Sequence, residues 1–269
     1  MTNIQYKETD TETYYDRVHK EYLVNWNEDG SMHWGYFDDL DAACGYPEFR
    51  RASEHWNQYM LERSGITKES KVLDLCCGNG NSSLWIARHA QCEVVGIDIS
   101  ATHIENANTK AEDFPKLNVS FVKGSVTKMP FPDNFFTHVW CQAALFQVPT
   151  RALALQESFR VLNPDGTFIF DDMVKRVTNV SDTTRKHLYE RILIGDLFTP
   201  EFYQEQLTNL GFKVIENQDI SPHMRKCYQI QSDRHELTYP EVSLGYRKTK
   251  EAIEAGEIGW WFFLAKKAA

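Results

Sequence analysis

The sequence of 269 residues predicts an α/β fold with a doubly wound, mostly parallel sheet of seven strands. From Lys71 onward, short apolar runs alternate with helical segments, which is the pattern of a parallel sheet. The first apolar run leads into a tight turn that contains Gly78 and Gly80, and a helical segment follows directly. Hydrophobic residues make up 42% of the chain, which is enough for a sizeable core.

The expected strands cover residues 71–76, 93–98, 118–123, 135–141 and 166–171, with helices over 82–90, 101–113 and 151–162. Residues 163–166 read Asn-Pro-Asp-Gly and predict a turn that ends the last of these helices. A further helix over 199–210 has Thr199 as its cap, Pro200 at its first position and Gly211 at its end. Strands over 212–221 and 259–266 complete the sheet.

The chain is predicted to divide into an N-terminal helical cap over residues 1–66 and a sheet domain over residues 67–269. Within the cap, helices are expected over 14–26 and 48–64, with a turn at 27–30. The last two strands are too far apart for a tight hairpin. Residues 225–256 are therefore expected to fold as an inserted, helical segment.

The composition limits the possible partners and the cellular location. A net charge of −9 and the lack of a basic run argue against nucleic acid. The six cysteines show no C-x-x-C spacing, so neither a zinc site nor a disulfide framework is expected, and a reducing compartment fits. The sequence shows no signal peptide and no apolar stretch of about 20 residues. We therefore expect a cytoplasmic protein without stable membrane insertion, either a monomer or a homodimer.

The glycine turn predicts a seat for a nucleoside cofactor. Gly78 and Gly80 allow a close backbone approach, and the following helix directs free N–H groups to the same place. Asp98 ends the second strand about twenty residues after Gly78, where a carboxylate can accept hydrogen bonds from both ribose hydroxyls. Taken alone, Asp98 would be interpreted as a helix N-cap or a turn residue, and the glycine turn upstream favours the ribose role.

A carboxylate in the first strand indicates which cofactor binds. Asp74 is costly to bury unless it holds loop N–H groups or a ligand. An anion here would not help a pyrophosphate, whereas S-adenosylmethionine carries a sulfonium centre and an ammonium group. S-adenosylmethionine is therefore the predicted cofactor. Because Ser83 completes a degenerate G-x-G-x-x-G match, an NAD(P)-dependent oxidoreductase stays an alternative.

Four segments resemble the motifs of the class I S-adenosylmethionine-dependent methyltransferases, which have a Rossmann-like fold. They are VLDLCCGNG (72–80), VVGIDIS (94–100), VKGSVTKMPFPDNFFTHVW (122–140) and ESFRVLNPDGTFIFDDM (157–173). Two positions depart from the family pattern: Cys76 replaces the usual first glycine, and Ser125 replaces the usual acid of the third motif. The resemblance implies cofactor contacts from Asp74, Gly78, Gly80, Asp98, Ile99, Ser125, Val126 and Cys141.

The N-terminal segment resembles, more loosely, the cap of small-molecule methyltransferases of the tocopherol, sterol, cyclopropane-lipid and glycine-sarcosine types. The matching residues are the pair Tyr15-Asp16 and the aromatic stretch 31–37. The resemblance implies that Tyr15, Met32 and His33 lie over the methionine end of the cofactor, and that segment 225–256 lines the substrate pocket. The alternative for these aromatic residues is simple packing of the cap.

The predicted activity is transfer of a methyl group to a nitrogen or carbon of a small molecule, giving S-adenosylhomocysteine. The acceptor is expected to be an amine or a lipophilic compound, and no metal site is expected. His33, Tyr15 and Gln142 are the candidate catalytic residues, with His33 as the candidate base. Asp171 and Asp172, after the fifth strand, are equally compatible with the site or with a turn. A non-catalytic S-adenosylmethionine-binding protein is a further alternative.

Overall fold

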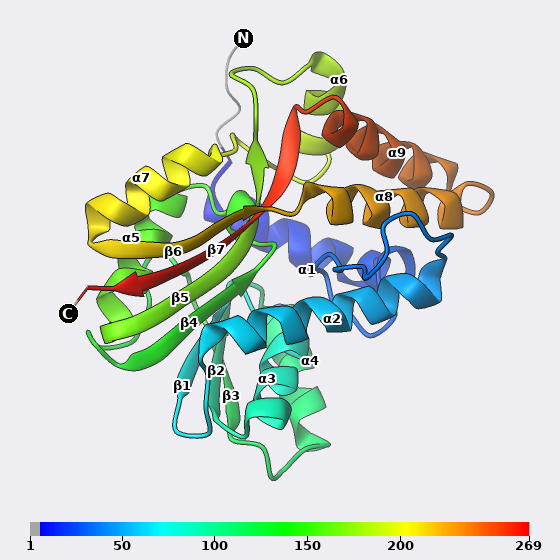
Figure 1. Ribbon diagram of the computed structural model, residues 1–269. Coiled ribbons are helices and arrows are strands. Elements are labelled where there is room, and N and C mark those ends of the chain that lie inside the picture. The colour runs from blue at the N-terminus through cyan, green and yellow to red at the C-terminus, as the bar shows by residue number, and fades with distance from the viewer. Residues whose placement is uncertain (1–5, 269) are drawn as a thin grey trace.

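The computed structural model describes residues 6–268 and confirms the Rossmann-like α/β fold with its seven-stranded, mostly parallel sheet (Figure 1). The strand order is β3-β2-β1-β4-β5-β7-β6. Strands β1 to β5 run parallel, and β7 is antiparallel to both of its neighbours. The strands are β1 Lys71–Leu75, β2 Glu93–Asp98, β3 Val119–Lys123, β4 Phe136–Gln142, β5 Leu162–Lys175, β6 Phe212–Asp219 and β7 Ile258–Lys267.

Helices lie between these strands and before the first of them. They are α1 Glu8–Asn25, α2 Tyr46–Ser64, α3 Asn81–Ala90, α4 Ala101–Glu112, α5 Arg151–Val161, α6 Asp182–Thr184, α7 Pro200–Leu210, α8 Ser221–His235 and α9 Pro240–Glu254. Two short segments, η1 Leu145–Gln147 and η2 Arg185–Tyr189, complete the set. Helices α8 and α9 pack side by side beyond one end of the sheet, with α2 next to α8 (Figure 1). The inserted segment is thus helical, and it begins at Ser221 rather than at residue 225.

The end signals of α7 work as predicted. The Thr199 hydroxyl accepts a hydrogen bond from the Phe202 N–H, and Gly211 ends the helix with a φ of 100°. A proline at the first helical position has no N–H to leave unpaired.

The predicted turn at residues 163–166 is wrong, because this segment is a bulge within β5. Leu162 pairs with Phe136, and the next ladder pair joins Thr167 to His138. The backbone already leaves the helical region at Leu162, and the residue before Pro164 is held extended by its proline neighbour. Between these two pairs, β5 has more residues than β4, and Asp165 adopts a φ of 61° within this bulge.

Buried tryptophans join the N-terminal helices to the sheet. The Asp171 carboxylate accepts hydrogen bonds from the indole N–H groups of Trp56 on α2 (2.8 Å) and Trp260 on β7 (2.6 Å). Gly35 lies so close to α2 that a Cβ there would stand 2.7 Å from the Ala52 backbone. Segment 31–37 is thereby held against α2. The division at residue 66 stays a prediction.

None of the helices found within residues 6–268 is long and apolar enough to cross a membrane.

Candidate functional site

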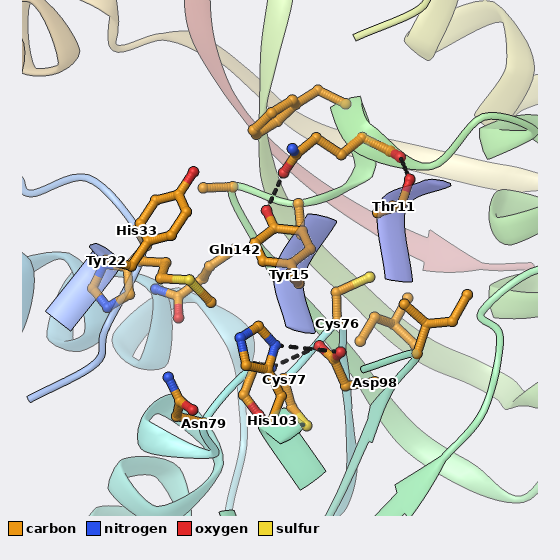
Figure 2. A pocket seen from close by; sticks show the side chains of 18 of the residues that line it. Thr11, Tyr15, Tyr22, His33, Cys76, Cys77, Asn79, Asp98, His103 and Gln142 are labelled. Carbon is orange, nitrogen blue, oxygen red and sulfur yellow. Dashed lines mark hydrogen bonds and ion pairs between the residues drawn. The ribbon is translucent and has the colours of Figure 1, made fainter. Parts of the chain in front are cut away.

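A cavity opens at the carboxyl ends of β1, β2 and β4, where the strand order reverses (Figure 2). Open parallel sheets bind their ligands at this switch point. The cavity holds about 1310 Å³ of empty space, including its open mouth. Its walls come from the glycine turn, from α1 and the loop that follows it, and from the segments around η1, α8 and α9.

The turn after β1 has an unusual backbone. Cys76, Gly78 and Gly80 all have positive φ angles, of 52°, 52° and 75°. Gly78 lines the cavity, and a Cβ there would stand 3.0 Å from the Met32 methyl group. Gly80 does not line the cavity: a Cβ there would meet the Phe121 ring at 2.6 Å. Gly80 is therefore needed for the turn and its packing, and a direct cofactor contact is not supported.

Asp98 has the turn and cap contacts that were one alternative, and its place in the cavity leaves the ribose contact possible. Its carboxylate accepts hydrogen bonds from the N–H groups of Gly78 and Ser100, both at 2.9 Å, so it fixes the turn and the start of α4. It also lines the cavity and is only 6% exposed. Carboxylate oxygens have about four lone-pair sites, which leaves acceptor capacity for ribose hydroxyls.

His103 is a cavity residue that the sequence reasoning missed. It stands on α4, with Nδ1 3.5 Å from an Asp98 oxygen, and neither ring nitrogen has a hydrogen-bond partner among residues 6–268 (Figure 2). A buried ring with two unpaired nitrogens is unusual in a folded protein. The available signal was its place in the first turn of the helix that follows the second strand.

Asp74 lies in the cavity wall as predicted. Its carboxylate accepts a hydrogen bond from the Ser83 hydroxyl at 2.5 Å. Burial raises the pKa of Asp74 to about 7, although the hydrogen bond from Ser83 acts in the opposite direction and lowers this pKa. A cationic ligand beside Asp74 would favour the charged carboxylate.

Tyr15 and Gln142 line the cavity but use their polar atoms within the protein. The Tyr15 hydroxyl donates to the Gln147 side chain, and burial raises the pKa of Tyr15 well above its usual value. The Gln142 amide accepts from the Ser82 hydroxyl at 2.6 Å and donates to Asn57 at 2.8 Å. These contacts favour positioning roles over proton transfer.

His33 lies across the cavity from Asp98 and is 6% exposed (Figure 2). Its Nδ1 lies 2.8 Å from the Trp34 carbonyl oxygen. A carbonyl only accepts, so Nδ1 carries the hydrogen and Nε2 of the neutral ring keeps a free lone pair. Burial lowers the pKa of His33, which favours this neutral form.

The other predicted residues divide into two groups. Met32, Ile99, Ser125 and Val126 line the cavity, whereas Cys141 is fully buried behind it. The Ser125 hydroxyl donates to Glu8 of α1 at 2.7 Å, and Glu8 is a second cavity residue missed from the sequence.

Asp171 and Asp172 do not reach the cavity. Asp171 holds the two tryptophans described above, and the Asp172 carboxylate accepts from the Tyr203 hydroxyl at 2.5 Å and the Phe146 N–H at 2.9 Å. Their role is to hold β5 and its surroundings in place.

The loop between α1 and α2 is tied to the glycine turn. Asn79 donates to the Gly30 carbonyl at 3.1 Å, and Asn81 donates to the Asp29 carbonyl at 2.8 Å. Lys110 donates to the same Asp29 carbonyl at 2.7 Å. These contacts place Met32 and His33 over the turn.

The residues present fit S-adenosylmethionine. Two carboxylates lie in one wall of the cavity: Asp98 can accept hydrogen bonds from ribose hydroxyls, and Asp74 favours a ligand with a cationic group over a pyrophosphate. The unpaired nitrogens of His103 supply further polar sites at the Asp98 end. Within the same residues 6–268, no three His, Cys, Asp or Glu side chains gather so as to hold a metal ion.

Comparison with known sequences also indicates a methyltransferase. Residues 73–170 match the family described as methyltransferase domain. The (+)-O-methylkolavelool synthase of Herpetosiphon aurantiacus is 28% identical over 88% of this chain and 84% of its own length. The glycine/sarcosine/dimethylglycine N-methyltransferase of Actinopolyspora halophila is 28% identical over 80% of this chain, which spans only 40% of that relative.

Solved structures share the fold over almost the whole chain. The geranyl diphosphate C-methyltransferase of Streptomyces coelicolor A3(2), in complex with S-adenosyl-L-homocysteine, has a TM-score of 0.82 and 16% identity over 100% of both chains. A cyclopropane synthase of Mycobacterium tuberculosis has a TM-score of 0.83 and 16% identity over 99% of this chain and 100% of that one. The predicted family resemblance and the predicted cofactor are confirmed.

Replacing Asp98 tests the ribose contact. Asp98→Ala is expected to weaken S-adenosylmethionine binding by about 2–4 kcal/mol, because a charge-assisted pair of hydrogen bonds is lost. Titration calorimetry measures the affinity, and a melting curve shows whether the fold survives. Asp113→Ala, at an exposed position after α4, is the control. Binding within a few-fold of the wild type would show that Asp98 only holds the turn.

The raised pKa of Asp74 predicts pH-dependent binding. Below about pH 7 the free protein carries a proton on Asp74, and a cationic ligand must displace it. Affinity for S-adenosylmethionine is therefore expected to fall as the pH is lowered from 7 to 5, by at most about tenfold per pH unit. Calorimetry in buffers of different ionisation enthalpy counts the released proton. Asp74→Asn should flatten the profile; a flat profile in the wild type would contradict the assignment.

Proposed function

We propose that the protein, which belongs to the class I S-adenosylmethionine-dependent methyltransferases, transfers a methyl group to a nitrogen or carbon atom of a small-molecule acceptor. The cavity would align S-adenosylmethionine with this acceptor. The observation that carries the proposal is the composition of the cavity. Its sheet side holds Asp74, Gly78 and Asp98, and its other side is lined by aromatic residues from distant segments. One enclosed space therefore offers a cofactor seat and an acceptor seat.

The bound cofactor supplies a sulfonium-activated methyl group, so the protein must chiefly align the two reactants and keep water out. Asp98 would hold the ribose, and Asp74 would attract the ammonium end. Ser125 and Val126 line the part of the wall expected to frame the adenine. The loop carrying Met32, tied to the glycine turn, would cover the methionine end.

The aromatic side of the cavity supports an amine or lipophilic acceptor. Its lining residues include Tyr22, Trp26, Trp34, Phe146, Tyr228 and Tyr246. Aromatic faces attract cations and also bury apolar groups. The names of two relatives give O-methylkolavelool as a product in one case and glycine, sarcosine and dimethylglycine as substrates in the other, so these names do not decide between the two kinds of acceptor.

His33 is the best-placed residue for proton transfer, because it is neutral with a free lone pair on Nε2 and lies in the cavity wall. It would either accept a proton from the acceptor or contact the cofactor. Tyr15 and Gln142 support the site by position, since their polar atoms are already engaged with other side chains.

Two alternatives remain to be distinguished by experiment. An NAD(P)-dependent oxidoreductase would explain Gly78 and Asp98, but it is disfavoured by Asp74, because a carboxylate in this wall does not help to bind a pyrophosphate. A non-catalytic S-adenosylmethionine-binding protein would need the same cofactor seat. It differs only in transferring no methyl group.

The test is a transfer assay with S-adenosylmethionine labelled in its methyl group, against panels of small amines, phenols and isoprenoid lipids. We expect label in at least one acceptor, with stoichiometric S-adenosylhomocysteine, and none with Asp98→Ala. Calorimetry with S-adenosylmethionine and with NADPH runs in parallel. Binding of S-adenosylmethionine without any transfer would favour the non-catalytic alternative, and binding of NADPH in its place would favour the oxidoreductase.

His33→Ala separates the possible roles of this residue. If His33 is a base, kcat should fall by about 10²–10⁴ with unchanged cofactor affinity. If it contacts the cofactor, the cofactor KM should rise with kcat largely kept. The control is His55→Ala, at a half-exposed position on α2. Wild-type kinetics with only a lower melting temperature would remove His33 from the site.

A further inference from the structure

The aromatic side of the cavity contains one cation, Arg191, which follows η2. Its guanidinium carbon stands 5.3 Å from the centre of the Tyr246 ring. Tyr14, Tyr22 and Tyr228 also lie close enough to act on its charge. These residues come from α1, α8 and α9, so the arginine lies where three helices meet.

Arg191 has no carboxylate partner within 4.0 Å among residues 6–268. Its Nε donates to the His187 carbonyl at 2.9 Å, and Nη2 lies 3.5 Å from the Thr249 hydroxyl. The guanidinium also donates to the Tyr228 hydroxyl, so its hydrogen bonds go to neutral oxygens and its charge meets no anion among these residues. Arginine is seldom enclosed by protein without an anion to pair with.

A second arginine, the buried Arg151, also has no carboxylate within 4.0 Å among residues 6–268, and its Nη1 has no hydrogen-bond partner there. It donates to the carbonyls of Phe146 and Asp196 at 2.9 Å and 2.5 Å, and the nearby carboxylate of Asp172 balances its charge. Arg191 differs because it lines the cavity, where tyrosine rings surround it. We therefore expect the anion that balances its charge to come from a ligand in the cavity.

We propose that Arg191 binds a carboxylate group of the methyl acceptor, whose body lies against the surrounding tyrosines. The inference rests on the proposed function, because it assigns a substrate class to the same cavity. A planar guanidinium matches a carboxylate with two parallel hydrogen bonds. The oxygen of the Tyr228 hydroxyl, in the cavity wall, accepts from Trp34 and Arg191, so the hydroxyl can still donate its own hydrogen as a third bond.

The charge count favours a carboxylate over a phosphate or diphosphate. Arg191 is the only Lys or Arg among the cavity-lining residues within 6–268, and this region offers no cluster of side chains for a metal ion. One guanidinium balances one negative charge. Asp74 and Asp98 in the opposite wall would repel a ligand of higher charge.

The experiment uses the full chain saturated with S-adenosylhomocysteine and two matched probe pairs: sarcosine with sarcosinamide, and phenylacetate with phenylacetamide. Each acid and its amide share a skeleton and differ in charge. Quenching of Trp26 and Trp34, which line the cavity, reports binding. We expect at least one acid to bind more tightly than its amide by about 10- to 100-fold.

Variants show whether the preference depends on Arg191. Arg191→Met keeps the stem and should abolish the preference for the acid while leaving the affinity for S-adenosylhomocysteine within about twofold. Arg191→Lys keeps the positive charge but loses the planar guanidinium, so it should retain only part of the preference for the acid. Arg185→Met is the control, because Arg185 packs 5.6 Å from the Tyr189 ring outside the cavity.

Three results would overturn the inference: no acid preference in either pair, a preference that survives in both Arg191 variants, or inorganic phosphate binding more tightly than either acid. A lower melting temperature for Arg191→Met with the acid preference intact would mean that Arg191 only packs against Tyr246. Failure to bind S-adenosylhomocysteine would instead count against the proposed function, and this binding is measured separately.

Discussion

The hydrogen bond from the Gly78 N–H to the Asp98 carboxylate is the contact on which the site depends. It joins the turn after β1 to the end of the neighbouring strand β2, and the Cys77 N–H adds a bond to the Ile97 carbonyl at 3.0 Å. A Cβ at Gly78 would press on the Met32 methyl group at 3.0 Å, and the turn has positive φ angles at Cys76, Gly78 and Gly80. The pairing of β1 with β2 therefore fixes the conformation of the turn. That conformation in turn determines where α3 begins and what shape the proposed cofactor site has.

The same turn also positions the N-terminal segment that covers it. Asn79 and Asn81 follow Gly78 directly, and their side-chain amides hold the carbonyls of Gly30 and Asp29. The loop that places His33 in the cavity is thus attached to the cofactor seat itself. A ligand that orders the turn would also order the loop, which gives a physical reason for a cover that excludes water once the cofactor is bound.

The predictable part of the molecule is the part that is local in sequence. Strand β1, its glycine turn and Asp98 form one continuous unit, so the fold and the place of the cavity could be predicted from their spacing, and most of the predicted cofactor residues do line that cavity. His103 and Glu8 could not, because their places depend on how α4 and α1 pack over the strand ends. Gly80 and Cys141 sit in the right motifs but turn away from the cavity. The segment at 163–166 has turn residues, yet pairing with β4 on both sides makes it a bulge.

The aromatic side of the cavity, proposed to bind the acceptor, is not local in sequence. This explains why the substrate could not be predicted from the sequence alone. The walls of this side come from α1, the segment around η2, α8 and α9, and α1 ends more than two hundred residues before α9 begins, so these segments meet only in the folded chain. No spacing rule connects Arg191 to Tyr22 or Tyr246. That Arg191 lies among tyrosines without a carboxylate can be recognised only when its neighbours in the fold are known, and on this charge the proposed class of acceptor rests.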